Sequence, residues 1–497
     1  MPSVPKRASK RVHSDPSTPE LLLDYAPARQ AARPRSLADE QGGLKLSIGP
    51  QAVPARSSHP SRDHSVERGL PPPPLAPLAP PLPLPALADE LASFREFGQA
   101  TRKLVTTFPG ADGQPREVPT FVNEFWTARQ RQASSLQEIS YRACFKPQLP
   151  RFFIERLTQP GEVVYDPFMG RGTTVLEAAL LGRVPCGCDI NPLSVVLTRP
   201  RLQPPSLAAV AQRLGQIDFA SSNEFPEELL VFFHADTLRA IASLKQYLLA
   251  RRAAKSLDDV DDWICLLALN RLTGHSSGFF SVYTLPPNQA VSVKSQLKIN
   301  ADRNQTPPPR DVRAIILKKT RILLRDCDPA TLRVLANVAP KAVLLTEPAA
   351  HTPELPARSV SLVVTSPPFL NVVDYATDNW LRCWFLGLDA KSVKLTVPRK
   401  LDAWQAAMTE VFRELHRVLK PGGNIAFEVG EVHAGKTKLE EAVLPCGVAV
   451  GLEPELVLIN DQEFTKTANC WGVDNMAKGT NTNRIVLFRR PKDARQD

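Results

Sequence analysis

The strongest constraint on the fold of this 497-residue chain is a strand, a glycine-containing turn, a helix and a second strand in direct succession. We predict a short buried strand at residues 162–168, the turn at 170–174, the helix at 175–181 and the second strand at 184–190. Two strands joined through a helix lie parallel in one sheet. The segment therefore predicts an open α/β sheet.

The strand pattern stops after residue 204 and returns at residue 341. Residues 205–338 are predicted to be mainly helical, apart from a loop-like stretch at 277–310. The helical patterns lie at 207–249, 257–272 and 312–324. Later strands are predicted at 341–346, 359–365, 424–432, 455–460 and 484–489, and an amphipathic helix at 404–419. We therefore expect one α/β domain, split into residues 89–204 and 339–491 by a largely helical insertion at 205–338.

The first 88 residues have a different composition, because they hold 18 of the 48 prolines of the chain. No helical or strand period persists among them, which is typical of disordered segments. Residues 71–85 predict an extended polyproline stretch that serves as a semi-rigid spacer, with docking to an aromatic-lined groove as the alternative. We therefore expect residues 1–88 to be a disordered, proline-rich tail.

Composition argues against several protein classes. No apolar run is long enough to span a membrane, because prolines interrupt the apolar stretch at 70–87. The eight cysteines include no Cys-x-x-Cys pair, so neither a disulfide framework nor a zinc site is supported. We expect a cytoplasmic protein without a bound metal.

The motif DPFMGRGTT, residues 166–174, places the carboxylate of Asp166 at the end of a predicted strand. Gly170 and Gly172 would let the backbone approach a ligand closely. The motif lacks the third glycine of the dinucleotide fingerprint and the Gly-Lys-Ser/Thr of a phosphate loop. Because Asp166 would repel a pyrophosphate, the motif favours a cationic or amino-bearing ligand, and an ordinary strand-to-helix turn is the alternative.

A second acid, Asp189, follows the next predicted strand in the sequence CDINP. An acid about twenty residues beyond such a turn accepts hydrogen bonds from the ribose hydroxyls of an adenosine. Capping of the following segment is the alternative. Together with the preceding motif, Asp189 favours a nucleoside-containing ligand.

The motif TSPPF, residues 365–369, follows another predicted buried strand. Its prolines remove two backbone donors but keep their carbonyls. The Ser366 hydroxyl and the carbonyls of Pro367 and Pro368 would form a cup of acceptors, and Phe369 would offer a face for stacking. Such a cup suits a flat ligand with an amino group, such as a nucleobase amine, whereas a tight turn is the alternative.

Positive charge is concentrated in the insertion. The net charge of the chain is +10, and residues 271–325 hold ten lysines and arginines against two aspartates. Phe279, Phe280 and Tyr283 lie in the same stretch. We interpret it as a phosphate-binding surface, with a solvated helix face as the alternative. The candidate binding residues are Lys294, Lys298, Arg303, Arg310 and Arg313.

Together, DPFMGRGTT, CDINP and TSPPF resemble the exocyclic-amino DNA methyltransferases, which move a methyl group from S-adenosylmethionine to cytosine N4 or adenine N6. The resemblance spans residues 142–490, and SPPF in place of DPPY or NPPY looks more like the cytosine-N4 branch. Residues 141–157 resemble the segment of the family that closes over the methionine moiety, and 469–488 resemble its C-terminal hairpin beside the target base. The resemblance implies a Rossmann-like methyltransferase sheet, with residues 205–338 as the target-recognition region.

The resemblance also implies roles for individual residues. The methionine end of the cofactor would be lined by Asp166, Phe168, Gly170, Gly172 and Thr173. Asp189 would hold the ribose. Ser366 and the Pro367 carbonyl would accept hydrogen bonds from the target amine, and Phe369 would stack on the flipped base. The family has an acidic residue near the adenine. In this sequence the corresponding stretch offers Glu347, one position earlier, so the adenine contacts stay open.

Hydrogen bonds from the amine to Ser366 and Pro367 would align its lone pair with the methyl group, which predicts direct in-line transfer. A cytosine-C5 enzyme would instead need a thiolate nucleophile after a proline. Cys186 lies inside a predicted strand and Cys446 lies well beyond the TSPPF strand, so we reject that chemistry.

The sequence therefore predicts a site-specific cytosine-N4 DNA methyltransferase that acts on double-stranded DNA as a monomer. Whether a cognate restriction endonuclease is a partner stays open. Adenine-N6 methylation is the nearest alternative function. The other alternative functions are methylation of RNA bases and non-catalytic binding of nucleic acid.

Overall fold

The computed structural model describes residues 83–493 with gaps at 111, 128–132, 142–143, 223, 285–289, 369–374, 391–397, 399, 433–436 and 462–481. Phe369 and most of the stretches 71–85 and 469–488 therefore lie outside the described residues. The first helix, α1 (Leu84–Ser93), begins before the expected end of the tail at residue 88.

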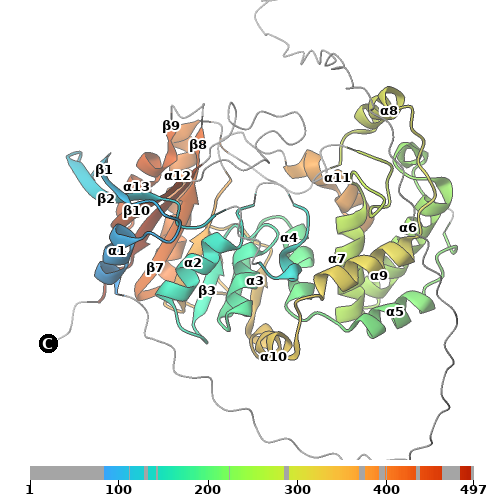
Figure 1. The fold of residues 1–497 in the computed structure, drawn as a ribbon, viewed down its shortest axis with the longest axis horizontal. Helices are drawn as coiled ribbons and strands as arrows, with labels where there is room; N and C mark the ends of the chain where they lie inside the picture. The colour runs from blue at the N-terminus through green and yellow to red at the C-terminus, as the bar shows by residue number, and fades with distance from the viewer. Residues whose placement is uncertain are drawn as a thin grey trace, which may run out of the picture. The chain divides into compact units, whose positions relative to one another are not determined.

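The centre of the fold is a sheet whose order among the described residues is β1-β2-β10-β11-β7-β6-β3-β4-β5 (Figure 1). The run from β7 to β5 is parallel throughout, whereas β11 lies antiparallel between β7 and β10. The strands are β1 (Arg102–Pro109), β2 (Pro115–Asn123), β3 (Val163–Asp166), β4 (Val184–Cys188), β5 (Val343–Leu345), β6 (Val360–Thr365), β7 (Leu419–Val429), β10 (Glu453–Asp461) and β11 (Thr482–Arg489). The α/β fold class expected from the sequence is confirmed.

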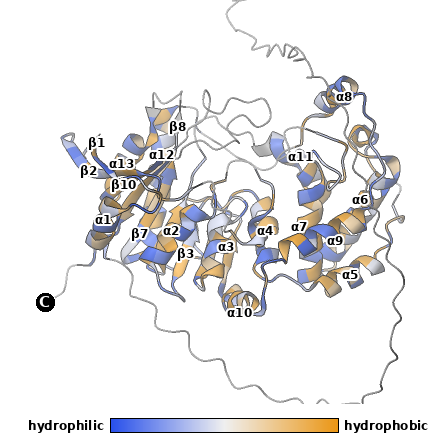
Figure 2. Cartoon of the chain, in the orientation of Figure 1, coloured by the Kyte–Doolittle hydropathy of each residue, from blue (hydrophilic) through white to orange (hydrophobic). Residues whose placement is uncertain are grey.

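Helices cover both faces of the sheet, which explains why every residue of β6 is buried. α12 (Leu401–Val418) and α13 (Leu439–Val448) pack on one face, where Phe412 contacts Phe427 and Phe488. α1 and α2 (Gln148–Leu157) pack on the other face, as does α3 (Thr173–Leu180). α12 carries both polar and apolar residues in Figure 2, as expected for a helix with one face on a sheet.

The insertion between β4 and β5 is helical, as expected. Its helices are α5 (Leu207–Gln216), α6 (Ala235–Ala253), α7 (Asp259–Arg271), α8 (Val293–Asp302), α9 (Val312–Leu323) and α10 (Pro329–Val338). Its apolar side chains form one continuous cluster with α3, α4 (Leu193–Thr198) and α11 (Tyr375–Leu386). The insertion therefore shares its hydrophobic core with the helices that follow β3 and β4.

Several local expectations were wrong. The first strand expected from the sequence is at 162–168, but β1 and β2 precede it in the chain. α8 forms within the stretch expected to be a loop, because Ser292 caps its first turn by accepting from Ser295 N–H. The strand expected at 424–432 begins earlier, because β7 starts at Leu419, directly after α12, and includes residues 421–423.

Within the part of the chain that the structure describes, no helix combines the length and the hydropathy that crossing a membrane requires. The same residues contain no group of three or more His, Cys, Asp or Glu side chains placed to hold a metal ion.

Candidate active site

The order of the strands determines where a ligand binds this sheet. From β3 the chain moves outward through β4 to β5 and then returns to form β6 on the other side of β3. In open α/β sheets ligands bind outside the carboxyl ends of the strands at such a reversal. Asp166 ends β3 and Thr365 ends β6, and the Thr365 hydroxyl donates to Asp166 Oδ1 over 2.6 Å. The two sequence motifs therefore meet at this reversal point.

Asp166 is almost fully buried, with 1% of its surface exposed. Burial raises the pKa of its carboxyl to about 7, against the lowering effect of donors from Thr365 and from Phe168 N–H. At neutral pH the group therefore lies near its titration midpoint, and a cationic ligand would stabilise its ionised form.

The Gly-x-Gly turn is fixed by the second acid. Asp189 accepts from Gly170 N–H over 2.9 Å through one carboxylate oxygen and from Asn191 N–H over 2.8 Å through the other. Each oxygen keeps further acceptor capacity, because a carboxylate offers about four lone-pair sites. Burial raises the pKa of Asp189 as well. Asp189 therefore orders the loop and also faces the cavity beside it.

The two glycines of the turn serve different purposes. Both have left-handed backbone angles, with φ of +51° at Gly170 and +76° at Gly172. A Cβ at Gly172 would collide with the side chain of Thr198, whereas one at Gly170 would come no closer than 3.7 Å to Tyr141. Gly170 lines the cavity and Gly172 does not, so Gly172 serves the close packing of the loop on α4.

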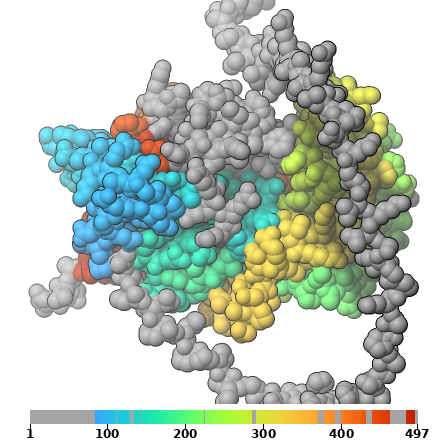
Figure 3. All heavy atoms as spheres, in the orientation of Figure 1, coloured from blue at the N-terminus to red at the C-terminus, as the bar shows by residue number. Residues whose placement is uncertain are grey.

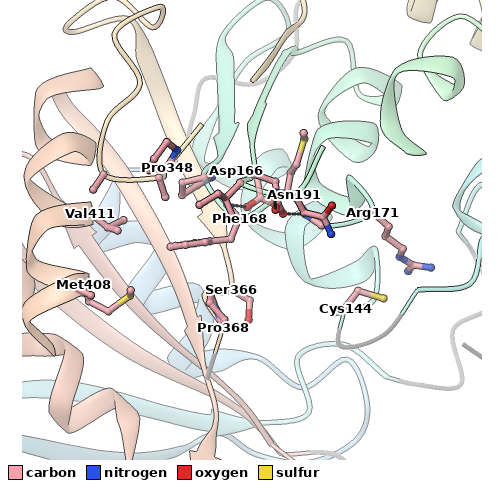
Figure 4. Close-up of a pocket in the computed structure, with 18 of the residues that line it drawn as sticks. Cys144, Asp166, Phe168, Arg171, Asn191, Pro348, Ser366, Pro368, Met408 and Val411 are labelled. Atoms are coloured by element: carbon pink, nitrogen blue, oxygen red, sulfur yellow. Dashed lines mark hydrogen bonds between the residues drawn. The ribbon is translucent and has the colours of Figure 1, made fainter. Parts of the chain in front are cut away.

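A cavity of about 400 Å³ opens at this point (Figure 4). Most of the expected site residues line it, namely Asp166, Phe168, Gly170, Thr173, Asp189, Ser366 and Pro368. Gly172 and Pro367 do not line it, and Phe369 lies outside the described residues. Tyr141, Cys144 and Phe145 line it too, which places the start of the 141–157 segment at the cavity as the resemblance implied. The structure thus brings motifs about 200 residues apart into one site.

Sequence reasoning missed the apolar wall of the cavity. Met408 and Val411 project from α12, and Figure 4 shows them across the cavity from Asn191. Pro348 follows β5 and lines the cavity with the two alanines after it, whereas Glu347 does not line it. The helical period of 404–419 was recognised, but that pattern does not distinguish a wall of a cavity from ordinary core packing.

The Ser-Pro-Pro cup is only partly as expected. The Pro368 carbonyl accepts from the Trp404 indole N–H over 3.1 Å and is thereby occupied. The Ser366 hydroxyl lies near the carboxylate of Glu428 on β7, which accepts from the Asn483 amide over 3.1 Å. Burial raises the pKa of Glu428, and these two side chains oppose the increase. A serine hydroxyl that donates to a carboxylate keeps its oxygen lone pairs for another donor.

A bridging segment, residues 134–141, connects the cavity to the insertion. Gln137 donates to the Thr173 carbonyl, and the Ser140 carbonyl accepts from Asn270 of α7 over 3.2 Å. The Glu138 carbonyl accepts from Lys319 of α9 over 2.6 Å. Tyr141, at the end of the segment, lines the cavity. The insertion therefore contacts the same segment that bounds the candidate site.

The five expected phosphate-binding residues do not form one cluster. Lys294 and Lys298 are exposed on α8. The guanidinium carbon of Arg303 lies 3.8 Å from the ring centroid of Tyr283, and that of Arg313 lies 4.5 Å from the ring centroid of Phe219. Arg313 also donates to the Ile217 carbonyl. Arg310 lines a second, basic cavity.

Comparisons with known proteins agree with the motifs. Residues 100–197 match the family model described as DNA methylase of the N6/N4 type. The type II methyltransferase M.BsoBI from Geobacillus stearothermophilus is 22% identical over 56% of this chain and 58% of its own length. The type II methyltransferase M.MvaI from Kocuria varians is 30% identical over 19% of this chain and 20% of its own length. The chain thus spans less than two thirds of these relatives, and its homologues are type II methyltransferases.

Among solved structures, TrmN from Thermus thermophilus gives a TM-score of 0.27 at 13% identity, covering 70% of this chain and 50% of its own. A SAM-dependent methyltransferase from Methanosarcina mazei gives 0.27 at 10% identity, covering 69% and 98%. Because these TM-scores are low, the fold assignment rests on the strand order of the sheet.

Proposed function

We propose that this protein is a DNA methyltransferase that transfers a methyl group from S-adenosylmethionine to the N4 amine of cytosine in duplex DNA. The observation that carries the proposal is the junction of two motifs in one cavity. A buried acid and a Gly-x-Gly turn lie on one side, and a serine with a proline-rich acceptor loop lies on the other. The match to an N6/N4 DNA methylase model and to type II methyltransferases supports it.

The cavity fits the cofactor chemically. S-adenosylmethionine carries a cationic amino group, a ribose and a flat adenine, and when bound it supplies the methyl group. Asp166 would accept from the amino group and Asp189 from the ribose hydroxyls. The apolar side chains of Met408 and Val411 would pack against the adenine, and Glu410 lines the cavity on the same side. Removing water from such a site strengthens each of these charge contacts.

The Ser-Pro-Pro loop would hold the target amine. Ser366 would donate its hydrogen to the nearby carboxylate of Glu428, so its oxygen would accept one amine N–H, and the Pro367 carbonyl would accept the other. This arrangement favours a tetrahedral nitrogen, whose lone pair is withdrawn from conjugation with the ring and aimed at the methyl group. Glu428 is then a positioning residue that fixes the direction of the Ser366 hydroxyl, and alignment provides most of the rate enhancement.

Cytosine N4 is favoured over adenine N6 by the sequence SPPF, and adenine N6 is the alternative. The two cysteines that follow a proline offer no nucleophile at the target loop, since Cys186 lies inside β4 and Cys446 inside α13. The insertion would read the sequence, with Lys294 and Lys298 as exposed phosphate contacts. We propose that the protein acts in the cytoplasm as a monomer, without a metal.

The test is incubation of the full chain with S-adenosylmethionine labelled on the methyl group and duplex DNA, followed by nucleoside analysis. N4-methylcytosine is the expected product. Detection of N6-methyladenine would support adenine N6 as the target instead. Label found only in RNA would refute the proposal that DNA is the substrate.

A further inference from the structure

A second cavity, of about 300 Å³, lies in the insertion where one face of α9 meets the end of α7. In Figure 3 the yellow atoms, which include α9 and α10, reach the viewed surface of the molecule. Four cations line the cavity: Arg271, Arg310, Lys318 and Lys319. The one acid that lines it among the described residues is Asp311, and its carboxylate already accepts from Ala314 N–H to cap α9.

Lys319 is buried and Arg271 is half-buried, and neither has an acidic partner in the cavity. Lys319 is 7% exposed and donates to the neutral carbonyl of Glu138, whose carboxylate pairs instead with Arg325 over 2.9 Å. Arg271 donates to the carbonyl and the side-chain oxygen of Asn270. Burial lowers the pKa of Arg271 to about 10, and burial together with the nearby Arg271 charge lowers that of Lys319 to about 8.

Burying like charges close together is costly unless a counter-charge is supplied. Arg310 adds a buried Nε that has no hydrogen-bond partner among the described residues. Lys318 lies exposed at the rim. A single tetrahedral anion placed between these four side chains would offset part of their charge and accept several charge-assisted hydrogen bonds.

We propose that this cavity binds one phosphodiester group of the DNA backbone, held between Arg271, Arg310, Lys318 and Lys319. The inference rests on the proposed function and adds to it the place where the duplex is anchored. DNA is favoured as the source of the phosphate because Lys319 also holds the bridging segment that leads to Tyr141 in the first cavity. A duplex whose phosphate binds here would be held in a fixed position relative to the site that receives its target base.

The salt dependence of DNA binding tests the proposal. The logarithm of the binding constant falls with the logarithm of salt concentration by about 0.9 for each phosphate contact. Lys319→Gln should lower this slope by about 0.9 and weaken binding roughly tenfold for any duplex sequence. Lys318→Gln should also lower the slope. Because Lys318 lies at the exposed rim, its replacement cannot disturb the core, so this variant tests the proposal if Lys319→Gln fails to fold.

Arg333→Gln is the matched control, because it removes the same charge from an exposed position on the next helix, α10. Its slope should equal that of the wild type. Titration of inorganic phosphate without DNA separates the two sources of a phosphate group. If phosphate alone binds tightly in a Lys319-dependent way while the DNA slope is unchanged in both variants, the cavity serves a free anion and the proposal is overturned.

The outcomes also separate this inference from the proposed function. If the wild type methylates and binds DNA but both lysine variants keep the wild-type slope, only the anchor is wrong. If the wild type neither methylates nor binds duplex DNA, the proposed function fails and the anchor fails with it.

Discussion

The molecule contains two cavities of opposite character. The first lies at the ends of β3 and β6, carries the acids Asp166, Asp189 and Glu410 together with Arg171, and is otherwise largely apolar. The second lies between α7 and α9 and carries four cations against one acid that is already engaged. In the proposed function, a cationic cofactor and a polyanionic duplex would therefore have separate, complementary sites in one chain. We expect the two ligands to bind independently and to meet at Ser366.

The largest effect is expected at this meeting point. Ser366→Ala removes the acceptor for the target amine, so kcat should fall on the order of 100-fold while cofactor affinity and DNA affinity stay near wild type. Methyl transfer in single turnover and two separate binding titrations measure the three quantities. Ser359→Ala, directly before the strand that Ser366 follows, should leave all three unchanged. Wild-type turnover in Ser366→Ala would rule out the alignment mechanism.

Asp189→Ala should weaken cofactor binding roughly 10- to 100-fold, because it removes a charged acceptor and releases Gly170 N–H. Affinity for DNA should not change, since Asp189 belongs to the first cavity only. Calorimetry with the cofactor and fluorescence anisotropy with DNA check both statements. A parallel loss of DNA affinity would show that the two cavities are not independent.

The pKa of about 7 at Asp166 predicts a pH dependence for the first cavity alone. The ionised carboxylate favours the cationic cofactor, so affinity should fall by up to about tenfold per pH unit as pH drops from 7 toward about 6. Without cofactor the sign is opposite, because the folded state binds the proton more tightly than the unfolded chain does at 3.8. Stability of the free protein should therefore fall as pH rises from about 4 to 7.

Asp166→Asn serves as the check, because it should abolish the pH dependence of cofactor binding between pH 6 and 8 and weaken that binding. Thermal unfolding at pH 8 should then occur at a temperature a few degrees higher than in the wild type. An unchanged pH profile in Asp166→Asn would assign the dependence to another group.

The smallest effect is expected on α8. Lys294→Gln and Lys298→Gln remove exposed charges that lie outside the second cavity, so each should weaken DNA binding by no more than about threefold. Both variants are compared with Lys319→Gln by the same anisotropy titration. A larger loss on α8 than at Lys319 would move the main phosphate contact from the cavity to the exposed helix.

Local patterns predicted the first half of the site well. The strand, the Gly-x-Gly turn and the helix at 163–180 follow from residues adjacent in the chain, so the sequence alone was enough to place Asp166 and Asp189 at strand ends. The β1–β2 hairpin was missed because β1 buries almost none of its residues and shows no alternation.

Glu428 was missed for a different reason. Its partner Ser366 is more than 60 residues away, and the two meet only because β6 and β7 pair with Thr365 opposite Phe427. Such a register is set by packing across the whole sheet, which a local pattern does not reveal. The same applies to the cations of the second cavity, which the charge count located in the insertion but did not assign to a common pocket.

The common hydrophobic core of the insertion and of helices α3 and α4 has a consequence for how this chain could acquire a new target sequence. Leu193 and Leu197 of the α/β half pack in the same cluster as Trp263 and Leu267 of the insertion. A foreign recognition region grafted between β4 and β5 would have to supply matching side chains for these helices, or the sheet itself would lose support. Exchange of specificity between relatives should therefore succeed by altering side chains on the surface of the insertion more readily than by transplanting it whole.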